Sequence, residues 1–132
     1  MTFFCDIEKE ADLYTVCFPD MTSVRTFGNS MEHALEMARE ALEGNLEVCL
    51  DHSLDIPVSQ YRGGHPIEVS PKLAFAIQLR RARGSHTQKE VAKAVGMSYQ
   101  QYQRLENPHK TNPTLETMYR LQKVFGVPFL TL

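Results

Sequence analysis

Hydrophobic and polar side chains alternate over the first thirty residues of the chain, which is the pattern of β-strands with one buried face. The alternation is clear over residues 3–7 and residues 14–18, and it is shorter over residues 24–27. Turn-forming pairs, Pro19-Asp20 and Gly28-Asn29, end the second and third of these runs. The pattern therefore predicts three consecutive strands.

From Ser30 the hydrophobic spacing changes to that of an amphipathic helix. Ser30 is a suitable N-cap, and apolar residues at helical spacing continue to Cys49, whereas the opposite side carries mainly glutamates. This β-β-β-α order is expected to form one domain over residues 1–59. Residues 60–69, which include Gly63-Gly64, are expected to be a linker with room for a short strand.

Residues 70–132 carry a purely helical pattern. Ser70-Pro71 is an N-cap followed by proline at the first helical position, and Thr114 can cap a last helix that Gly126 ends. Two shorter helices fit between them, so this second domain is expected to hold four helices. The chain is therefore predicted to be an α+β protein, with a β-β-β-α domain joined to an all-α domain.

The two middle helices form a helix-turn-helix pattern. Thr87 with Glu90, and Ser98 with Gln101, are each spaced as a capping box, in which two side chains satisfy backbone N–H groups at a helix start. Gly96 lies between the two boxes, where a residue in the left-handed conformation can end the first helix. The second helix is therefore expected to begin almost directly after the first one ends.

The second of these helices presents a polar outer surface once its apolar residues, Tyr102 and Leu105, are turned inward. Glutamine and arginine side chains hydrogen-bond the edges of bases in the major groove, so this surface favours sequence-directed DNA binding. A solvated hairpin in an ordinary helical bundle is the alternative, but the repeated capping and the glutamine-rich surface argue against it. The outward residues are Ser98, Tyr99, Gln100, Gln101, Gln103 and Arg104.

Charge is distributed very unevenly along the 132 residues. Residues 1–69 contain thirteen acidic and four basic side chains, a net charge of −9, and residues 70–132 contain three and ten, a net charge of +7. A basic domain with a helix-turn-helix has the electrostatic character of a protein that binds the phosphate backbone. DNA repels the acidic domain, which is expected to face away from DNA and either to bind a basic partner or only to keep the chain soluble.

The segment from Ser70 to about Val127 closely resembles the DNA-binding domain of the phage-repressor or Xre type. The residues that carry this resemblance are Ile77, Arg81, Thr87-Gln88, Val91-Ala92, Val95-Gly96, Leu105-Glu106-Asn107 and Pro113-Thr114-Leu115. The resemblance implies that Gln88 anchors the first helix of the motif on DNA, that the next helix reads bases and that the following loop contacts the backbone. Together with the outward residues above, the DNA-binding candidates are Gln88, Ser98, Tyr99, Gln100, Gln101, Gln103, Arg104, Lys110, Thr111 and Asn112.

The segment from about Phe3 to Ser59 resembles the HicB family of bacterial antitoxins. The matching residues are Tyr14-Thr15-Val16, Phe18-Pro19-Asp20, Thr26, Gly28-Asn29-Ser30, Glu32, Ala34, Ala38, Glu40-Ala41-Leu42 and Ile56-Pro57. The resemblance implies a partial RNase H-like fold without the chemistry of that enzyme. It also implies a partner, the HicA toxin, which is a small basic ribonuclease that cleaves messenger RNA.

Acidic side chains of the first domain are a sensible electrostatic match for such a basic toxin. A solvated helix surface is the simpler explanation for any one of these residues, so the assignment is an expectation about the surface as a whole. The toxin-binding candidates are Asp20, Glu32, Glu36, Glu40 and Glu43.

Enzymatic activity is not expected. An RNase H-like nuclease needs several carboxylates around a divalent cation. Asp6 and Asp20 lie on or beside predicted strands, but Asp6 shares with Glu8 a strand face that solvent exposure explains, and no further acidic residue has an apolar strand context. Cys5, Cys17 and Cys49 have no metal-ligand spacing, so no metal or other cofactor is expected. Neither a signal peptide nor an apolar run of membrane-spanning length is found, which predicts a cytoplasmic protein without a membrane partner. The resemblance to HicB antitoxins implies a bacterial protein, located at the nucleoid when bound to DNA.

The combined hypothesis is an antitoxin that neutralises a HicA-type toxin and represses its own operon, binding operator DNA as a homodimer or a higher oligomer. Val127, Phe129, Leu130 and Leu132 form an apolar tail that is expected either to make the dimer contact or to cover the helices of its own chain. The alternative function is a stand-alone dimeric repressor whose first domain senses a ligand or only dimerises.

Overall fold

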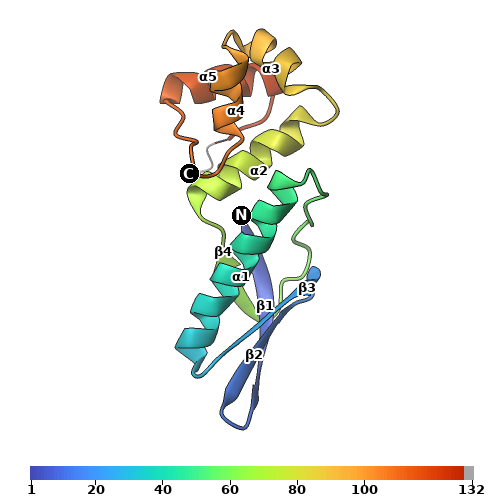
Figure 1. Cartoon of the computed structure of the whole chain (residues 1–132), viewed down its shortest axis with the longest axis vertical. Coiled ribbons are helices and arrows are strands. Elements are labelled where there is room, and N and C mark those ends of the chain that lie inside the picture. Colours follow the sequence, from blue (N-terminus) through green and yellow to red (C-terminus); the bar gives the residue numbers. More distant parts are fainter. Residues whose placement is uncertain (130–132) are drawn as a thin grey trace. The chain divides into compact units, whose positions relative to one another are not determined.

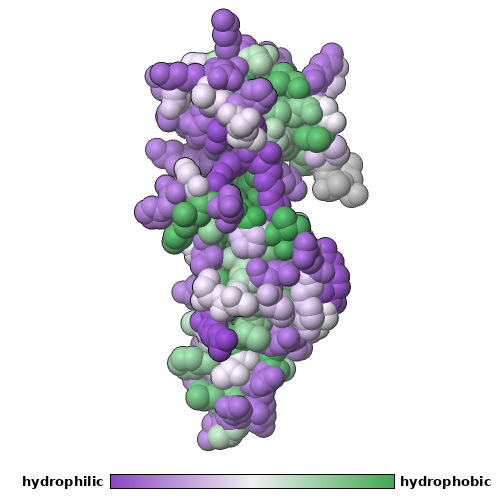
Figure 2. Space-filling view, turned by 90° about the vertical axis from the view of Figure 1, so that its right-hand side faces the viewer, coloured by the Kyte–Doolittle hydropathy of each residue, from purple (hydrophilic) through white to green (hydrophobic). Residues whose placement is uncertain are grey.

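A computed structural model describes residues 1–129 of the chain (Figure 1). The chain forms two compact units, Met1–Ser70 and a second unit that begins at Pro71. The first unit mixes strands with one helix and the second contains helices, which confirms the predicted α+β class. Figure 2 shows largely hydrophilic residues at the surface, with smaller hydrophobic areas between them.

The first unit is a four-stranded antiparallel sheet with one long helix. Its elements are β1 (Thr2–Glu10), β2 (Leu13–Phe18), β3 (Met21–Gly28), α1 (Met31–Asp51) and β4 (His65–Glu68). The strands lie in the order β3-β2-β1-β4, and β3 extends beyond the residues 24–27 expected from the hydrophobic pattern alone.

Helix α1 covers one face of the sheet because its apolar residues recur on one side. Ala34, Ala38, Leu42 and Leu46 on this side are fully buried, and the sheet contributes alternate residues of each strand, Phe3, Cys5, Val16 and Phe18 among them. The Ser30 hydroxyl accepts a hydrogen bond from the His33 N–H at 3.0 Å and so caps the helix as the sequence predicts. The other face of the sheet carries no helix of this unit.

The segment expected to be a linker belongs to the first unit. The Asp20 carboxylate accepts hydrogen bonds from the backbone N–H groups of Gln60 and Tyr61, at 2.8 and 2.9 Å. β4 then pairs with residues Thr2–Cys5 of β1. Gly64, with φ of 70°, lies so close to the Cys5 carbonyl that a side chain could not fit, so this glycine serves close packing and not flexibility.

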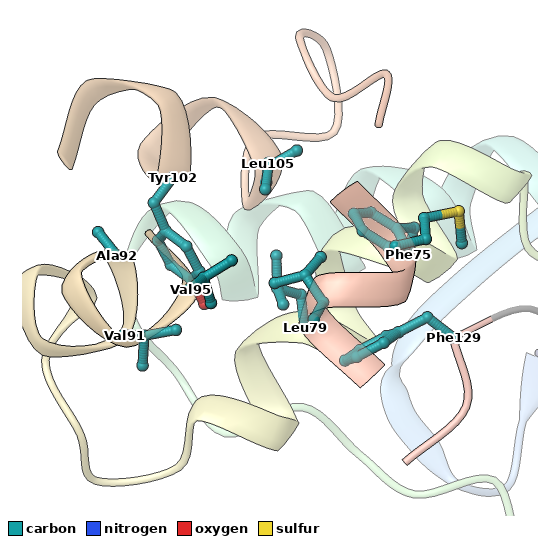
Figure 3. Packing of buried hydrophobic residues seen from close by; sticks show 10 residues of the cluster. Phe75, Leu79, Val91, Ala92, Val95, Tyr102, Leu105 and Phe129 are labelled. Carbon is teal, nitrogen blue, oxygen red and sulfur yellow. The ribbon is translucent and has the colours of Figure 1, made fainter. Parts of the chain in front are cut away.

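The second unit contains α2 (Pro71–Arg83), α3 (Gln88–Val95), α4 (Tyr99–Leu105) and α5 (Leu115–Phe125), the four helices that the sequence predicts. Their apolar sides meet in one core (Figure 3). Figure 3 shows Tyr102 of α4 directed toward Val95 of α3, with Leu79 of α2 beside them. Within residues 1–129, no helix combines the length and the apolar character needed to span a membrane.

Part of the apolar tail covers the core of its own unit. The Phe129 ring is buried and makes edge-on contacts with the rings of Phe75 and Phe125, at centroid distances of 5.8 and 5.9 Å. Phe129 is therefore a core residue of its own unit and is not available for a dimer contact, whereas Val127 is exposed. Leu130 and Leu132, the other tail residues, lie outside the described residues.

Gly28 provides a test of the packing between β3 and α1. A Cβ atom at this position would collide with the backbone of His33 and Ala34, whereas a Cβ at Gly44 of α1 meets nothing within 4 Å. We expect Gly28→Ala to destabilise the first unit by about 1–3 kcal/mol because the helix must shift away from the sheet. Gly44→Ala is the control and should stabilise it by about 0.5–1 kcal/mol, since alanine is the better helix former.

The measurement is urea unfolding of the full chain, followed by the amide NMR signals of the sheet. Equal effects of Gly28→Ala and Gly44→Ala on the unfolding free energy would contradict the close approach of strand and helix.

Candidate nucleic-acid interface

The turn between α3 and α4 is fixed by local hydrogen bonds. Gly96 adopts the left-handed conformation, with φ of 82°, and its N–H donates to the carbonyls of Ala92 and Lys93 at the end of α3. The Met97 N–H also donates to the Ala92 carbonyl, at 3.0 Å. These bonds end α3 and turn the chain directly into α4, as the spacing of the two caps predicts.

The start of α4 carries a complete capping box. The Ser98 hydroxyl accepts from the Gln101 N–H at 3.1 Å, and the Gln101 side-chain oxygen accepts from the Ser98 N–H at 3.0 Å. The box predicted at Thr87 is only half formed: Thr87 caps the Glu90 N–H, but the Glu90 carboxylate pairs with His86 at 3.3 Å. Part of the hydrogen-bonding capacity of Ser98 and Gln101 is therefore used inside the protein.

The outer surface of α4 has the composition that the sequence predicts. Tyr102 and Leu105 are buried, while Gln100, Gln103 and Arg104 are exposed. Amide and guanidinium groups placed in this way on one helix can donate to and accept from base edges in the major groove. α4 is consequently the candidate recognition helix.

Tyr99 is held by its neighbours at the start of this surface. Its hydroxyl accepts a hydrogen bond from Nε2 of Gln103 at 2.9 Å, and Nζ of Lys89 lies 5.3 Å from the centre of its ring. The ring and the amide are thus oriented before any ligand binds. Lys89 extends the polar surface onto α3, a contribution that could not be recognised from the capping pattern.

Glu106 joins three helices from inside the second unit. Its carboxylate accepts hydrogen bonds from Nε and Nη2 of Arg83, at 2.7 and 3.0 Å, and from Nε2 of Gln88, at 3.3 Å. The Glu106 side chain is only 5% exposed and that of Arg83 is 19% exposed. The paired carboxylate raises the pKa of Arg83, and burial together with the Glu106 carboxylate raises the pKa of Tyr102.

This arrangement positions the side chain of Gln88, which is half-buried at the start of α3. One amide N–H donates to Glu106, so the amide plane is fixed while its oxygen stays available to another donor. The sequence contains the Leu105-Glu106-Asn107 motif, but nothing in the motif alone indicates the ion pair with Arg83.

The loop after α4 presents only some of the residues expected to contact the DNA backbone. The N–H groups of Lys110 and Thr111 donate to the Asn107 carbonyl, which closes the loop. Lys110 and Asn112 are exposed, whereas Thr111 is 1% exposed. The loop therefore offers one cation and one amide to a ligand, and the Thr111 side chain belongs to the interior.

Comparison with protein families identifies both units. Residues 4–70 match the family described as HicB_like antitoxin of bacterial toxin-antitoxin system. The chain belongs to this HicB-like antitoxin family. Residues 77–132 match a helix-turn-helix family, which agrees with DNA binding by the second unit of this HicB-like protein. A comparison with curated proteins finds no match.

The acidic toxin-binding candidates of the HicB-like unit are not equally accessible. The Asp20 carboxylate holds the segment after α1, as described above, and the Glu43 carboxylate accepts a hydrogen bond from the Ser70 hydroxyl at 2.7 Å. Glu32, Glu36 and Glu40 are exposed along α1. Two of the five candidates thus have a structural role, and three form an exposed acidic row.

Glu106→Gln tests the ion pair that positions the helix-turn-helix. We expect a loss of about 1.5–3 kcal/mol in the unfolding free energy of the second unit, because Arg83 loses a charged and largely buried partner. The matched control is Glu116→Gln, which breaks an exposed pair with Arg120, at 3.1 Å, and should cost about 0.5 kcal/mol or less. Urea unfolding followed by the NMR signals of α4 measures both; equal losses would contradict the role given to Glu106.

Proposed function

We propose that this HicB-like protein neutralises a HicA-type ribonuclease toxin with its first unit and represses the toxin–antitoxin operon with its second. The observation that carries the proposal is the match of one chain to both an antitoxin family and a helix-turn-helix family. The charge distribution supports it, since the unit that would bind a basic toxin carries the negative charge and the unit that would bind DNA carries the positive charge.

In the proposed DNA complex, α4 enters the major groove of the operator. Gln100, Gln103 and Arg104 contact base edges, and Tyr99 lies beside them at the start of the helix. The second N–H of the Gln88 amide donates to a phosphate from the start of α3, and the loop residues Lys110 and Asn112 contact the sugar–phosphate backbone. Support comes from the exposure of these groups and from the hydrogen bonds that fix Tyr99 and Gln88.

The proposed operator complex contains two copies of the chain. One short recognition helix reads few base pairs, and two copies on half-sites about one helical turn apart multiply the discrimination. The proposed location is the bacterial cytoplasm, where both the operator and the messenger RNA targets of the toxin are found.

The recognition helix can be tested with Gln100→Ala and Arg104→Ala. Each substitution should reduce the preference for operator over unrelated DNA by about 1–3 kcal/mol, because a contact with a base edge is lost. Arg120→Ala is the control: it removes the same charge as Arg104→Ala, but from α5, where Arg120 pairs with Glu116. Fluorescence anisotropy at one fixed salt concentration gives both affinities, and full operator preference in both α4 variants would refute the assignment.

The antitoxin function can be tested in cells. A small open reading frame of HicA type is expected beside the gene, and its product should stop growth unless this protein is co-expressed. Rescue should persist in Gln100→Ala, since that substitution lies in the DNA-binding unit. Absence of such a neighbour, together with failure to rescue cells from HicA-type toxins, would instead favour the stand-alone repressor.

A further inference from the structure

The pairing of the strands shows which residues form the face of the sheet opposite α1. Residues 6, 8 and 10 of β1 lie opposite residues 17, 15 and 13 of β2, and residues 17 and 15 lie opposite residues 25 and 27 of β3. Because Phe3, Cys5, Val16 and Phe18 point toward α1, these alternate positions point to the other face. We call this side the open face.

A groove of about 370 Å³ lies on the open face. Carboxylates line its β1 side, with Asp6 and Glu8 in the wall and Glu10 next along the strand. Leu13 and Phe27 contribute apolar side chains that are 43% and 56% exposed. Arg25 of β3 adds one cation, so the groove combines two lining carboxylates and a guanidinium with exposed apolar surface.

The segment that follows α1 contacts Asp6, one of the residues that line the groove. The Tyr61 hydroxyl donates to the Asp6 carboxylate at 2.6 Å, a bond that raises the pKa of Tyr61, and the Arg62 guanidinium lies 5.6 Å from the Phe4 ring. Across the part of the chain that the structure describes, the side chain of Glu8 has neither a hydrogen bond nor an ion pair. The groove therefore holds, besides the Arg25 side chain from β3, a carboxylate without a bonded partner and two exposed apolar side chains.

We propose that the toxin docks on this groove, with a lysine or arginine facing Glu8 and Glu10 and an apolar side chain against Leu13 and Phe27. This inference rests on the proposed function and specifies its surface. Stable protein interfaces place apolar or aromatic anchors inside a polar rim, and the groove supplies both. Helix α1 also exposes the row Glu32, Glu36 and Glu40 together with Met31 and Val48. The groove differs because its acidic and apolar side chains line one hollow.

The charge of the unit argues for a basic partner in preference to a second copy of the chain. The first 69 residues carry a net charge of −9, so two copies would bring like charges together at the β1 carboxylates. A basic toxin instead gains attraction at the same positions, and complementary charge also accelerates the encounter of the partners.

Cys17 is a natural reporter for this docking site. It lines the groove and is partly exposed, whereas Cys5 and Cys49 are buried. Burial raises the pKa of the Cys5 thiol to about 11, which keeps it protonated and slow to react. A small thiol reagent should therefore modify Cys17 first, and a partner seated in the groove should protect it.

The first experiment uses the full-length chain and iodoacetamide, with the alkylated residue identified by mass spectrometry. The probe is a catalytically inactive variant of the adjacent HicA-type toxin. Saturation with this toxin should slow alkylation of Cys17 about tenfold or more, whereas operator DNA should not slow it. The Cys17→Ser variant lacks the Cys17 adduct and so confirms which mass-spectrometric peak belongs to it. Unchanged reactivity of Cys17 within a formed complex would overturn the proposal.

The second experiment compares two charge reversals at exposed positions, Glu8→Lys in the groove and Glu36→Lys on α1. Glu8→Lys should weaken toxin binding about tenfold or more, and Glu36→Lys about twofold or less. The opposite order would move the docking site to α1 and overturn the inference while the antitoxin function stands. If the wild-type chain binds no toxin, the proposed function itself fails. If Glu8→Lys does not fold, the alkylation of Cys17 in the wild-type chain still tests whether the toxin docks on the groove.

Discussion

The carboxylate of Glu106 accepts hydrogen bonds from Arg83 at the end of α2 and from Gln88 at the start of α3, while Glu106 itself follows the end of α4. A charge buried to this degree is stable only when it is paired, so the ends of three helices are held in one arrangement. The position of the Gln88 amide depends on it, and it links the end of α4 to the end of α2 in addition to the Gly96 turn that joins α3 and α4. The proposed DNA recognition therefore rests on an interior ion pair as much as on the exposed glutamines.

The two units carry opposite net charges and so suit different ligands. A positive unit can approach phosphates and a negative unit can approach a basic toxin, and each would be repelled by the ligand of the other. Charge alone does not define a binding surface, because exposed glutamates on a helix are well solvated. The open face adds a groove in which Leu13 and Phe27 lie beside the carboxylates of β1.

Local signals predicted the second unit well because they act within a few residues. The caps at Ser98 and Thr114 and the left-handed Gly96 and Gly126 appear where the sequence places them. Contacts between distant residues were not predictable in this way. No short-range pattern indicates that Asp20 anchors residues 60 and 61, or that Gly64 packs against Cys5, so a segment with the composition of a linker proved to be part of the sheet unit. The same limit applies to the ion pair of Arg83 with Glu106, and to the burial of Thr111 and Phe129.

The antitoxin function is tested most directly by the rate at which the adjacent HicA-type toxin cleaves messenger RNA in vitro as the full-length chain is added. We predict that cleavage falls to background once the chain is in excess, and that the Gln100→Ala variant inhibits equally well because the proposed inhibition belongs to the first unit. Undiminished cleavage at saturating concentrations of the folded chain would contradict the account.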